Sequence, residues 1–534
     1  MQDVPRPAET APNRRHRLLA VAVALFVGAT LVGQSMFAST FGITYDEPVY
    51  AAVGVRHTTW LARALSFDSG AWTRTALEAG WGNSGPTPSE ADWHPPVGKV
   101  WLEVCRHLPT PFGPYAQFRL GATLLWAGTA VVLLLWMTEL AGLLAGLGAA
   151  LAWLTMPSAV LHGNLAALDN PAAFFATLAT YLAWRQMRSP SRGATIGYGV
   201  VFGLGMASKF NVILLAPAVL LCAALWARPS LRGLLLATCL LAPVVFVLVW
   251  PWLWYDGPAH LAAVIRFHGR HSLIDTEYFG KITGTPAWHY PFVMLAVTTP
   301  LATLAAAMLG LRGLRGEPTR RLLLLTLLLH LLPFASPSAA KYNGVRLFLP
   351  ALPLLAALAG LGLARAADWL RGRASGDLTK LVSPAVLAAV ILPATVDVLT
   401  VHPYPTAFYN RLVGGSAGAA RRGLEVSYWG EPFRELLAVL SREAPQGASV
   451  YLHPPGAIAG LSSYRAVGIQ RADLRLTHGE EAARTADYYV YQNRPSEWDD
   501  LGRQLRRDRQ PLYTAYGGDA PVGFIWAREE AAPR

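Results

Sequence analysis

Long apolar runs recur along the 534-residue chain and limit what it can fold into more than any other feature. Crossing ~30 Å of hydrocarbon takes about 20 mostly apolar residues. Eleven runs approach this length, at about residues 18–38, 118–137, 141–160, 171–184, 194–208, 211–227, 233–254, 289–311, 322–338, 347–364 and 382–401. Only 15% of the residues are charged, against roughly 25% in a soluble domain. The sequence therefore predicts a polytopic α-helical membrane protein with about 11 transmembrane helices.

The basic residues orient these spans. Arg14 and its basic neighbours precede the first run, which has no clear cleavage site and so predicts an uncleaved anchor. Loops rich in Lys and Arg tend to stay in the cytoplasm, and arginines such as Arg185, Arg228 and Arg371 lie in the loops that this orientation places inside. We predict a multi-pass plasma-membrane protein with a cytoplasmic N-terminus and an extracytoplasmic C-terminal domain. The outer segments are then 39–117, 255–288 and 402–534.

The net charge of the chain does not by itself indicate a nucleic-acid partner. A net charge of +12 is typical of nucleic-acid binding, but cytoplasmic arginines of a membrane protein account for it, so no nucleic-acid partner is predicted. Cys105, Cys222 and Cys239 are too few and too scattered for a disulfide framework or a thiolate zinc site. No other residues form a convincing ligand cluster, so we predict no metal.

The composition changes after His402. Apolar runs shorten to strand-like pieces at 449–452, 488–491 and 523–526, preceded by a helix-like stretch at 432–440. We predict a cytoplasmic tail at 1–17, a membrane domain at 18–401 and a small extracytoplasmic α/β domain at 402–534.

Two adjacent carboxylates, Asp46 and Glu47, follow the first run among aromatic and apolar residues. Partial desolvation there raises the pKa of a carboxyl towards use as a general base. The alternative is a helix start, with Asp46 as N-cap or with Glu47 and Pro48 in the first turn. The spacing alone leaves both open.

A third carboxylate, Asp169, belongs to the sequence Leu168-Asp169-Asn170-Pro171 and falls at the same outer membrane face. Asn170 and Pro171 suit the N-cap and first position of a helix, which would be a purely structural role. Asp169 itself suggests function, because ionisable groups at membrane depth usually serve one.

Several basic residues fall at the predicted outer face, although the positive-inside bias favours Lys and Arg in the cytoplasm. Their position therefore needs an explanation. His94 and Lys99 flank the rigid Pro95-Pro96 turn, Lys209 follows the fifth run, and Lys341 and Arg346 precede the tenth. Binding of a lipid phosphate at the membrane interface would explain these basic residues. The alternatives are a structural turn for the first pair and snorkelling anchors for the others.

Carboxylates and cations on one membrane face suit inverting glycosyl transfer. A carboxylate can take the proton of the acceptor hydroxyl while cations stabilise the charge that grows on a phosphate leaving group. An outward site also implies a lipid-linked sugar donor.

The ordered motifs resemble the membrane glycosyltransferases of the GT-C fold, particularly glycosyltransferase family 39, which includes protein O-mannosyltransferases and bacterial lipid A aminoarabinose transferases. The matching pieces are Asp46-Glu47, His94-Pro95-Pro96-Val97-Gly98-Lys99, Asp169, Lys209, Pro286-Ala287-Trp288-His289-Tyr290-Pro291, Lys341 with Arg346, and Tyr428-Trp429-Gly430-Glu431. The resemblance covers about residues 15–435 and implies a GT-C-like membrane domain.

The resemblance also implies roles for individual residues. Asp46 would be the catalytic base, assisted by Glu47 and Asp169. Lys209, Lys341 and Arg346 would hold the donor phosphate, and His94, Lys99 and Tyr342 would bind substrate. Family members generally work without a required metal, and no cofactor is predicted.

The sequence therefore predicts an inverting hexosyl- or pentosyltransferase that moves a sugar from a polyprenyl-phosphate donor to a glycan, lipid or protein acceptor. The tail lacks the β-trefoil pattern of a protein O-mannosyltransferase, which leaves the acceptor open. One alternative is a transporter or flippase of a lipid-linked saccharide, although no repeat is visible. Another is a non-catalytic scaffold whose tail binds envelope partners.

Overall fold

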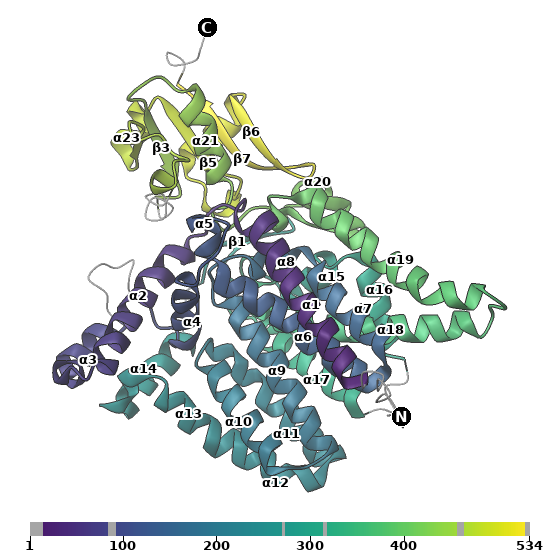
Figure 1. The fold of residues 1–534 in the computed structure, drawn as a ribbon. Helices are drawn as coiled ribbons and strands as arrows, with labels where there is room; N and C mark the ends of the chain where they lie inside the picture. Colours follow the sequence, from purple (N-terminus) through teal and green to yellow (C-terminus); the bar gives the residue numbers. More distant parts are fainter. Residues whose placement is uncertain (1–13, 84–91, 270–272, 313–317, 456–463, 529–534) are drawn as a thin grey trace, which may run out of the picture.

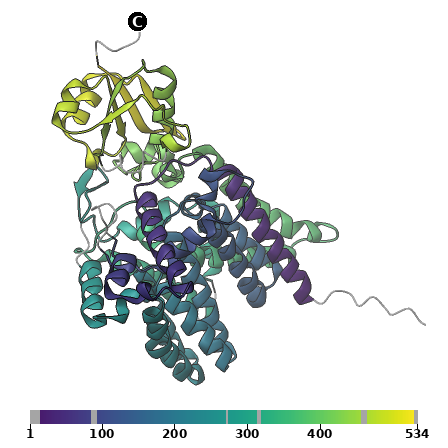
Figure 2. The same cartoon turned by 60° about the vertical axis from the view of Figure 1, so that its left-hand side comes forward.

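The structure is a computed structural model that describes residues 14–83, 92–269, 273–312, 318–455 and 464–528. Most of the predicted cytoplasmic tail, residues 1–13, lies outside the described residues. A helical bundle forms the main body, and a smaller domain built on a sheet sits at one end of it (Figure 1). The same arrangement holds after a 60° rotation (Figure 2).

Every predicted apolar run is helical, but not every helix is a clear span. The helices of the membrane domain are α1 (Arg14–Val32), α6 (Leu120–Ala141), α7 (Leu143–Leu154), α8 (Pro157–Gly163), α9 (Asp169–Arg188), α10 (Arg192–Met206), α11 (Leu215–Trp226), α12 (Arg228–Leu236), α13 (Ala242–Leu248), α15 (Tyr290–Val297), α16 (Leu301–Gly310), α17 (Pro318–Leu331), α18 (Ala351–Arg371) and α19 (Leu378–Val401).

Six helices of the described chain are long and apolar enough to cross a membrane, and up to eight if each of two bent pairs counts as one span. The six are His16–Ala38, Leu120–Ala141, Arg228–Leu248, Pro318–Ala335, Ala351–Arg371 and Leu378–Val401. The bent pairs are α7 with α8, at 70°, and α15 with α16, at 115°. The remaining three of the eleven runs form α9, α10 and α11, which fall short of these criteria. A polytopic membrane protein is confirmed, and the count of eleven stays a prediction.

Small residues let the central helices approach one another closely. A Cβ atom on Gly362 of α18 would lie 1.8 Å from the carbonyl oxygen of Ala306 in α16. A Cβ atom on Gly360 would lie 2.3 Å from the carbonyl oxygen of Ala145 in α7. Lipid tails are as apolar as leucine, so close van der Waals packing drives helix association in a membrane. These glycines hold α18 between α7 and α16.

Short helices and a hairpin fill the predicted outer segments. The first segment folds into α2 (Asp46–Leu65), α3 (Arg74–Trp81), α4 (Val97–Arg106) and α5 (Pro114–Gln117). The second contains α14 (Gly257–Gly269) and the antiparallel strands β1 (Thr276–Tyr278) and β2 (Lys281–Thr283). This hairpin contacts the chain that follows α19, because the amide of Gly280 donates to the carbonyl of Gly423 at 3.1 Å.

The C-terminal domain is built on a mixed five-stranded sheet of order β4-β3-β5-β7-β6. Its strands are β3 (Ser449–His453), β4 (Arg475–Thr477), β5 (Tyr488–Gln492), β6 (Tyr513–Gly517) and β7 (Ala520–Ala527), and its helices include α20 (Gly415–Arg421), α21 (Phe433–Glu443), α23 (Glu480–Thr485) and α24 (Asp500–Asp508). Successive side chains point to opposite faces of a strand. Val450 and Val490 therefore join the core shared with α21, whereas Tyr451 and Tyr489 pack with Leu505 of α24. The three strands and the helix predicted for this region are present, close to their predicted bounds.

The segment between α19 and α21 packs against the end of the bundle that faces the C-terminal domain. Asn410 donates through its side-chain amide to the carbonyls of Ala296 and Thr299, at 2.7 and 2.8 Å. Further along, a Cβ atom on Gly42 would lie 2.0 Å from the carbonyl oxygen of Glu431. This close approach places residues 428–431 against the start of α2.

Candidate active site

Four charged side chains of alternating sign form a largely buried row at the end of the bundle against which residues 428–431 pack. Asp46 lies in the first turn of α2, Asp169 begins α9, Lys209 follows α10, and Arg346 begins a 3₁₀ turn before α18. Arg346 donates through Nη2 to Asp46 and through Nε to Asp169 Oδ2, the latter at 3.2 Å. Lys209 Nζ donates to the other oxygen of Asp169. Residues up to 300 positions apart thus meet in one site.

Exposure differs sharply along this row. The side chain of Asp169 is 1% exposed, those of Lys209 and Arg346 are 9% exposed, and that of Asp46 is 27% exposed. Burial disfavours the Arg346 cation, but Asp46 and Asp169 outweigh burial and raise its pKa further above the ordinary range. Arg346 is therefore permanently charged, and Asp46 is the carboxylate that a molecule from outside can reach.

An aromatic ring from the C-terminal segment covers Arg346. The guanidinium carbon lies 4.3 Å from the ring centroid of Trp429, which fits a cation–π contact. The carbonyl of Trp429 also accepts from the amide of Tyr45 at 3.2 Å, next to Asp46. The residues after α19 therefore complete the site. In the sequence, only its place in a tail motif distinguishes Trp429, so this contact was not predicted.

The carboxylate of Glu47, beside Asp46, is buried and hydrogen-bonded within the protein. Arg119 donates to its two oxygens at 2.8 and 2.7 Å, and the amides of Ala166 and Thr44 donate to it at 2.8 and 2.9 Å. Both charged side chains are 0% exposed. Glu47 therefore ties the start of α2 to the chain before α6 and α9, which brings Asp46 and Asp169 to the same point.

Arg119, whose role was not predicted from the sequence, uses all five of its N–H groups. Besides Glu47, it donates to the carbonyls of Ala38, Phe41 and Gly42 at 2.8 to 3.0 Å. A guanidinium has five N–H donors and no acceptor, so this one is saturated. In the sequence it looks like an ordinary flank of the second apolar run, and its buried partner lies 72 residues away.

Lys341 and Tyr342 lie in the turn that leads to Arg346. Lys341 Nζ donates to the carbonyls of Ser336 and Ala339 at 2.7 and 3.1 Å. Burial raises the pKa of Tyr342 to about 12, so its hydroxyl stays protonated. Asn343 and Gly344 follow with φ of +55° and +63°. The left-handed pair turns the chain sharply, which favours glycine at the second position.

His94 and Lys99 share a second, smaller cluster. Lys99 is 2% exposed, pairs with Asp92 and donates to the carbonyl of His94 at 2.6 Å. Burial lowers the pKa of His94 to about 3, so the imidazole is neutral at ordinary pH. Its ring centroid lies 6.1 Å from that of Tyr50 and 5.4 Å from that of His268. Lys99 therefore fixes this turn from inside.

The two helix starts differ in detail from the structural alternatives. Helix α2 does begin at Asp46, with Glu47 and Pro48 in its first turn, but Tyr45 is its N-cap. Helix α9 begins at Asp169, so the N-cap interpretation of Asn170 is wrong. Asn170 instead donates to the carbonyl of Ala122 at 2.7 Å, because it lies one position inside the helix and faces α6.

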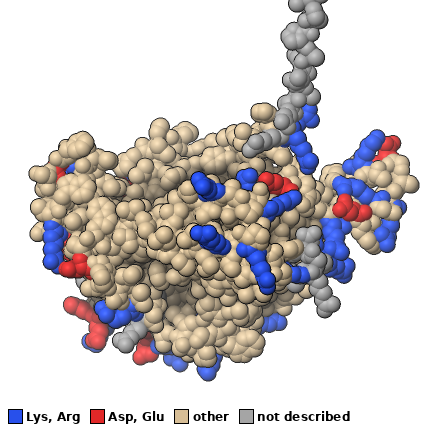
Figure 3. All heavy atoms as spheres, turned by 90° about the horizontal axis from the view of Figure 1, so that it is seen from below, with Lys and Arg blue, Asp and Glu red and all other residues tan. Residues whose placement is uncertain are grey.

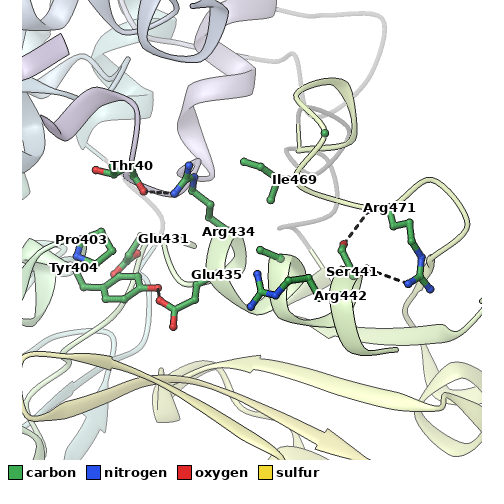
Figure 4. Close-up of a pocket in the computed structure, with 12 residues that line it drawn as sticks. Thr40, Pro403, Tyr404, Glu431, Arg434, Glu435, Ser441, Arg442, Ile469 and Arg471 are labelled. Atoms are coloured by element: carbon green, nitrogen blue, oxygen red, sulfur yellow. Dashed lines mark hydrogen bonds between the residues drawn. The ribbon is translucent and has the colours of Figure 1, made fainter. Parts of the chain in front are cut away.

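A separate polar cavity of about 560 Å³ lies between the end of the first span and α21. In the close-up, Arg434 points towards Thr40, and Glu435 lies beside Tyr404 (Figure 4). Several of its charges are engaged: Arg434 donates to the carbonyl of Thr40 at 3.0 Å, and Arg471 pairs with Asp473 at 2.6 Å. This cavity adjoins the candidate site through residues 429–431.

The positive charges that the site supplies are protein side chains, Arg346 and Lys209. Within the described ranges, no group of three His, Cys, Asp or Glu residues is placed to hold a metal ion. A row of two carboxylates and two cations can accept a proton at its exposed end and bind an anion such as phosphate at its cations.

Known proteins share this architecture. Residues 94–255 match the family model described as dolichyl-phosphate-mannose-protein mannosyltransferase. The chain is similar to ArnT from Cupriavidus metallidurans bound to undecaprenyl phosphate, with 13% identity, a TM-score of 0.51, and coverage of 98% of this chain and 100% of that one. It is also similar to the Archaeoglobus fulgidus oligosaccharyltransferase, with 11% identity, a TM-score of 0.51, and coverage of 90% and 70%. A search of curated proteins found no match.

The likeness to ArnT extends over 98% of this chain and shows that the chain has an ArnT-like GT-C fold, that of a multi-pass membrane protein. Residues 94–255 are similar to the protein mannosyltransferase family, glycosyltransferase family 39, whose enzymes use lipid-phosphate sugar donors. The resemblance to this family that the motifs indicate is confirmed over residues 94–255.

Proposed function

We propose that this enzyme transfers a sugar, with inversion, from a polyprenyl-phosphate donor to an acceptor hydroxyl at the outer face of the plasma membrane. The row Asp46–Arg346–Asp169–Lys209 is the observation that carries the proposal. Asp46 is the catalytic base, Arg346 and Lys209 bind the phosphate, and Asp169 holds these two cations in place.

The reaction follows from the charges. The acceptor oxygen attacks the anomeric carbon of the sugar while its proton passes to the carboxylate of Asp46. The bond from that carbon to the phosphate oxygen breaks, and its electron pair leaves with the polyprenyl phosphate. Arg346 and Lys209 stabilise the negative charge that grows on the phosphate, a kind of stabilisation worth roughly 10²–10³ in rate for a single donor.

Arg346 also couples the two substrates. In this structure its guanidinium bridges Asp46 and Asp169, so the proposed base is paired with a cation. A donor phosphate that binds Arg346 competes with Asp46 and frees the carboxylate to accept a proton. The donor therefore binds first, and the acceptor meets an active base only afterwards.

The other predicted site residues take supporting roles in this proposal. Glu47 positions Asp46 through Arg119, and Lys99 and Lys341 hold the turns on either side, because their ammonium groups already contact the protein. His94 and Tyr342 remain candidates for contacts with substrate.

The comparisons support a lipid-phosphate donor. ArnT was solved with undecaprenyl phosphate bound, and the matching family is named for dolichyl-phosphate-mannose. We therefore propose a sugar linked to a long polyprenyl phosphate, with mannose as the first candidate. A glycan, a lipid or a protein remains the proposed acceptor, and the N-terminus is proposed to lie in the cytoplasm.

Turnover in detergent tests the proposal against the transporter alternative, since transport requires two compartments. Purified protein is incubated with synthetic polyprenyl-phosphate sugars and a panel of envelope glycans, lipids and peptides, and released polyprenyl phosphate is measured. We expect turnover by the wild type and a 10²–10³-fold loss in Arg346→Ala and in Lys209→Ala. Wild-type turnover in both variants would overturn the assignment of the phosphate site. Arg411→Ala, a surface change in the C-terminal domain, is the matched control.

A further inference from the structure

The C-terminal domain holds the short stretch of chain that leads into α2, residues 40–45. Arg434 donates to the carbonyl of Thr40 at 3.0 Å, and the hydroxyl of Tyr464 accepts from the amide of Ile43. The proposed base is the first residue of α2 and follows this stretch directly. The C-terminal domain therefore contacts the chain immediately before the base.

A relay of hydrogen bonds continues from the last residue of this stretch into the sheet. The hydroxyl of Tyr45 donates to Oε1 of Gln492, the last residue of β5, at 2.5 Å. Nε2 of the same side chain donates to the hydroxyl of Ser427 at 2.8 Å, and that hydroxyl donates to Glu431 at 3.0 Å. Glu431 also accepts from the amide of Trp429 at 2.9 Å. The relay joins the residue before the proposed base to the residue whose ring covers the phosphate-binding arginine.

The middle of this relay is buried. Gln492 and Glu431 are 1% exposed, and Ser427 is 0% exposed. All five residues of β5 are buried, so an apolar side chain would also fit at the end of this strand. A buried amide costs free energy unless it is hydrogen-bonded. The glutamine at this position is therefore explained by its two hydroxyl partners rather than by packing.

The C-terminal segment also keeps the charged row away from water. At the opposite end of the bundle, Lys and Arg side chains lie at the molecular surface (Figure 3). At the end that faces the C-terminal domain, Arg346 is only 9% exposed, and the ring of Trp429 lies over it. Opposite charges attract more strongly where less water surrounds them. The position of this cover therefore affects the ion pair that the proposed mechanism must open.

We propose that Gln492 is a positioning residue for the reaction and that the C-terminal domain is thereby part of the active site. Its amide holds the residue before Asp46 in a fixed relation to Trp429, and so holds the base in a fixed relation to Arg346. A misplacement of about 1 Å can cost about 10²-fold in rate. The inference rests on the proposed function, because it concerns the base and the cation assigned there.

The first test is kinetic and uses three variants in detergent. The donor is a synthetic polyprenyl-phosphate sugar, and the acceptor is the one that gives turnover in the panel described above. Gln492→Met keeps the approximate length of the side chain and removes both hydrogen bonds, Tyr45→Phe removes one hydroxyl, and the third variant combines the two changes. We expect kcat to fall about 10- to 100-fold in each single variant, with the KM for the donor within about threefold of the wild-type value. The double variant should lose no more than the more damaging single variant, because both changes break the same hydrogen bond.

Hydrogen–deuterium exchange of the same proteins gives a second readout, which does not require turnover. The amide of Tyr45 donates to the carbonyl of Trp429 at 3.2 Å, so a loosened relay should expose it. We expect faster exchange over residues 43–47 in Gln492→Met than in the wild type. Asn493→Ala is the matched control for both readouts, because this neighbouring side chain donates to the carbonyl of Pro521 at 2.6 Å, inside the C-terminal domain.

A fall in kcat in both single variants, without further loss in the double variant and with faster exchange at the start of α2, supports the proposal. Wild-type kcat in Gln492→Met would overturn it, as would losses that multiply in the double variant or an equal loss in Asn493→Ala. If the wild type itself does not turn over, the proposed function fails, and unchanged exchange in Gln492→Met would then overturn this inference as well. If Gln492→Met does not fold, Tyr45→Phe decides, since it removes a single oxygen: wild-type kcat in that variant overturns the proposal, and a fall in kcat at an unchanged KM for the donor supports it.

Discussion

Replacing Glu47 with glutamine should damage the stability of the protein, whereas replacing its neighbour Asp46 with asparagine should damage catalysis. The two carboxylates are adjacent in sequence but differ in surroundings. Glu47 is 0% exposed and pairs with an equally buried Arg119, while Asp46 is 27% exposed. The Glu47→Gln change keeps the shape of the side chain and removes its charge.

The magnitude follows from the contacts. Removing one partner of a buried ion pair leaves the other charge uncompensated, which costs about 3–5 kcal/mol. Glu47→Gln also places an amide NH₂ against donors, since both Glu47 oxygens accept from N–H groups now. Asp46→Asn should cause a smaller loss of stability, because Arg346 retains Asp169 as a partner.

The assay is unfolding of purified protein in detergent, followed by tryptophan fluorescence. We expect a large loss of stability in Glu47→Gln and a small change in Asp46→Asn. Glu103→Gln is the control: Glu103 is buried, but its partners Arg106 and His107 are 34% and 69% exposed, so about 0–1 kcal/mol is expected. The reasoning fails if Glu47→Gln unfolds like the wild type, or if Asp46→Asn is the less stable of the two.

Three further predictions concern the site and its surroundings. Initial-rate kinetics should give an ordered mechanism with the donor first, because phosphate must draw Arg346 away from Asp46; random binding would contradict this coupling. His94→Gln should make the protein less sensitive to acid: burial lowers the pKa of His94 from 6.5 to about 3, so the folded state loses stability as the pH falls from about 6.5 towards 3, and unfolding midpoints at pH 7 and pH 4.5 measure the difference. An unchanged acid sensitivity in His94→Gln would refute this. Asp92→Asn should cost about 3–5 kcal/mol of stability by leaving Lys99 buried without its partner, and a midpoint like that of the wild type would show that Lys99 reaches water.

The helices were predictable because their signal is local. Each apolar run is continuous in sequence, and the three predicted strands of the C-terminal domain, β3, β5 and β7, each contain a short apolar run. Strands β4 and β6 have no such run and were not predicted. The bends were not predictable from hydropathy, since α7 with α8 and α15 with α16 read as unbroken spans. Pro157 at the start of α8 and Pro300 just before α16 mark the breaks, because proline cannot continue the hydrogen bonding of a preceding helix.

The candidate site was predictable only in part. Asp46, Asp169, Lys209 and Arg346 stand out because charge is rare in an apolar chain, and the structure brings them together. Arg119 does not stand out, because its partner Glu47 lies 72 residues away in the sequence and only the fold brings the two together. For the same reason Trp429 gave no signal, since its contact with Arg346 depends on how the segment after α19 folds back over the bundle.

The central claim is that Asp46 is the base that activates the acceptor. Its most direct test uses the Asp46→Asn variant with an identified acceptor. The rate at which this variant releases polyprenyl phosphate from a synthetic polyprenyl-phosphate sugar is measured. We expect a 10²–10⁴-fold fall in kcat with little change in the unfolding temperature. A folded Asp46→Asn variant that turns over at the wild-type rate would show that Asp46 is not the base.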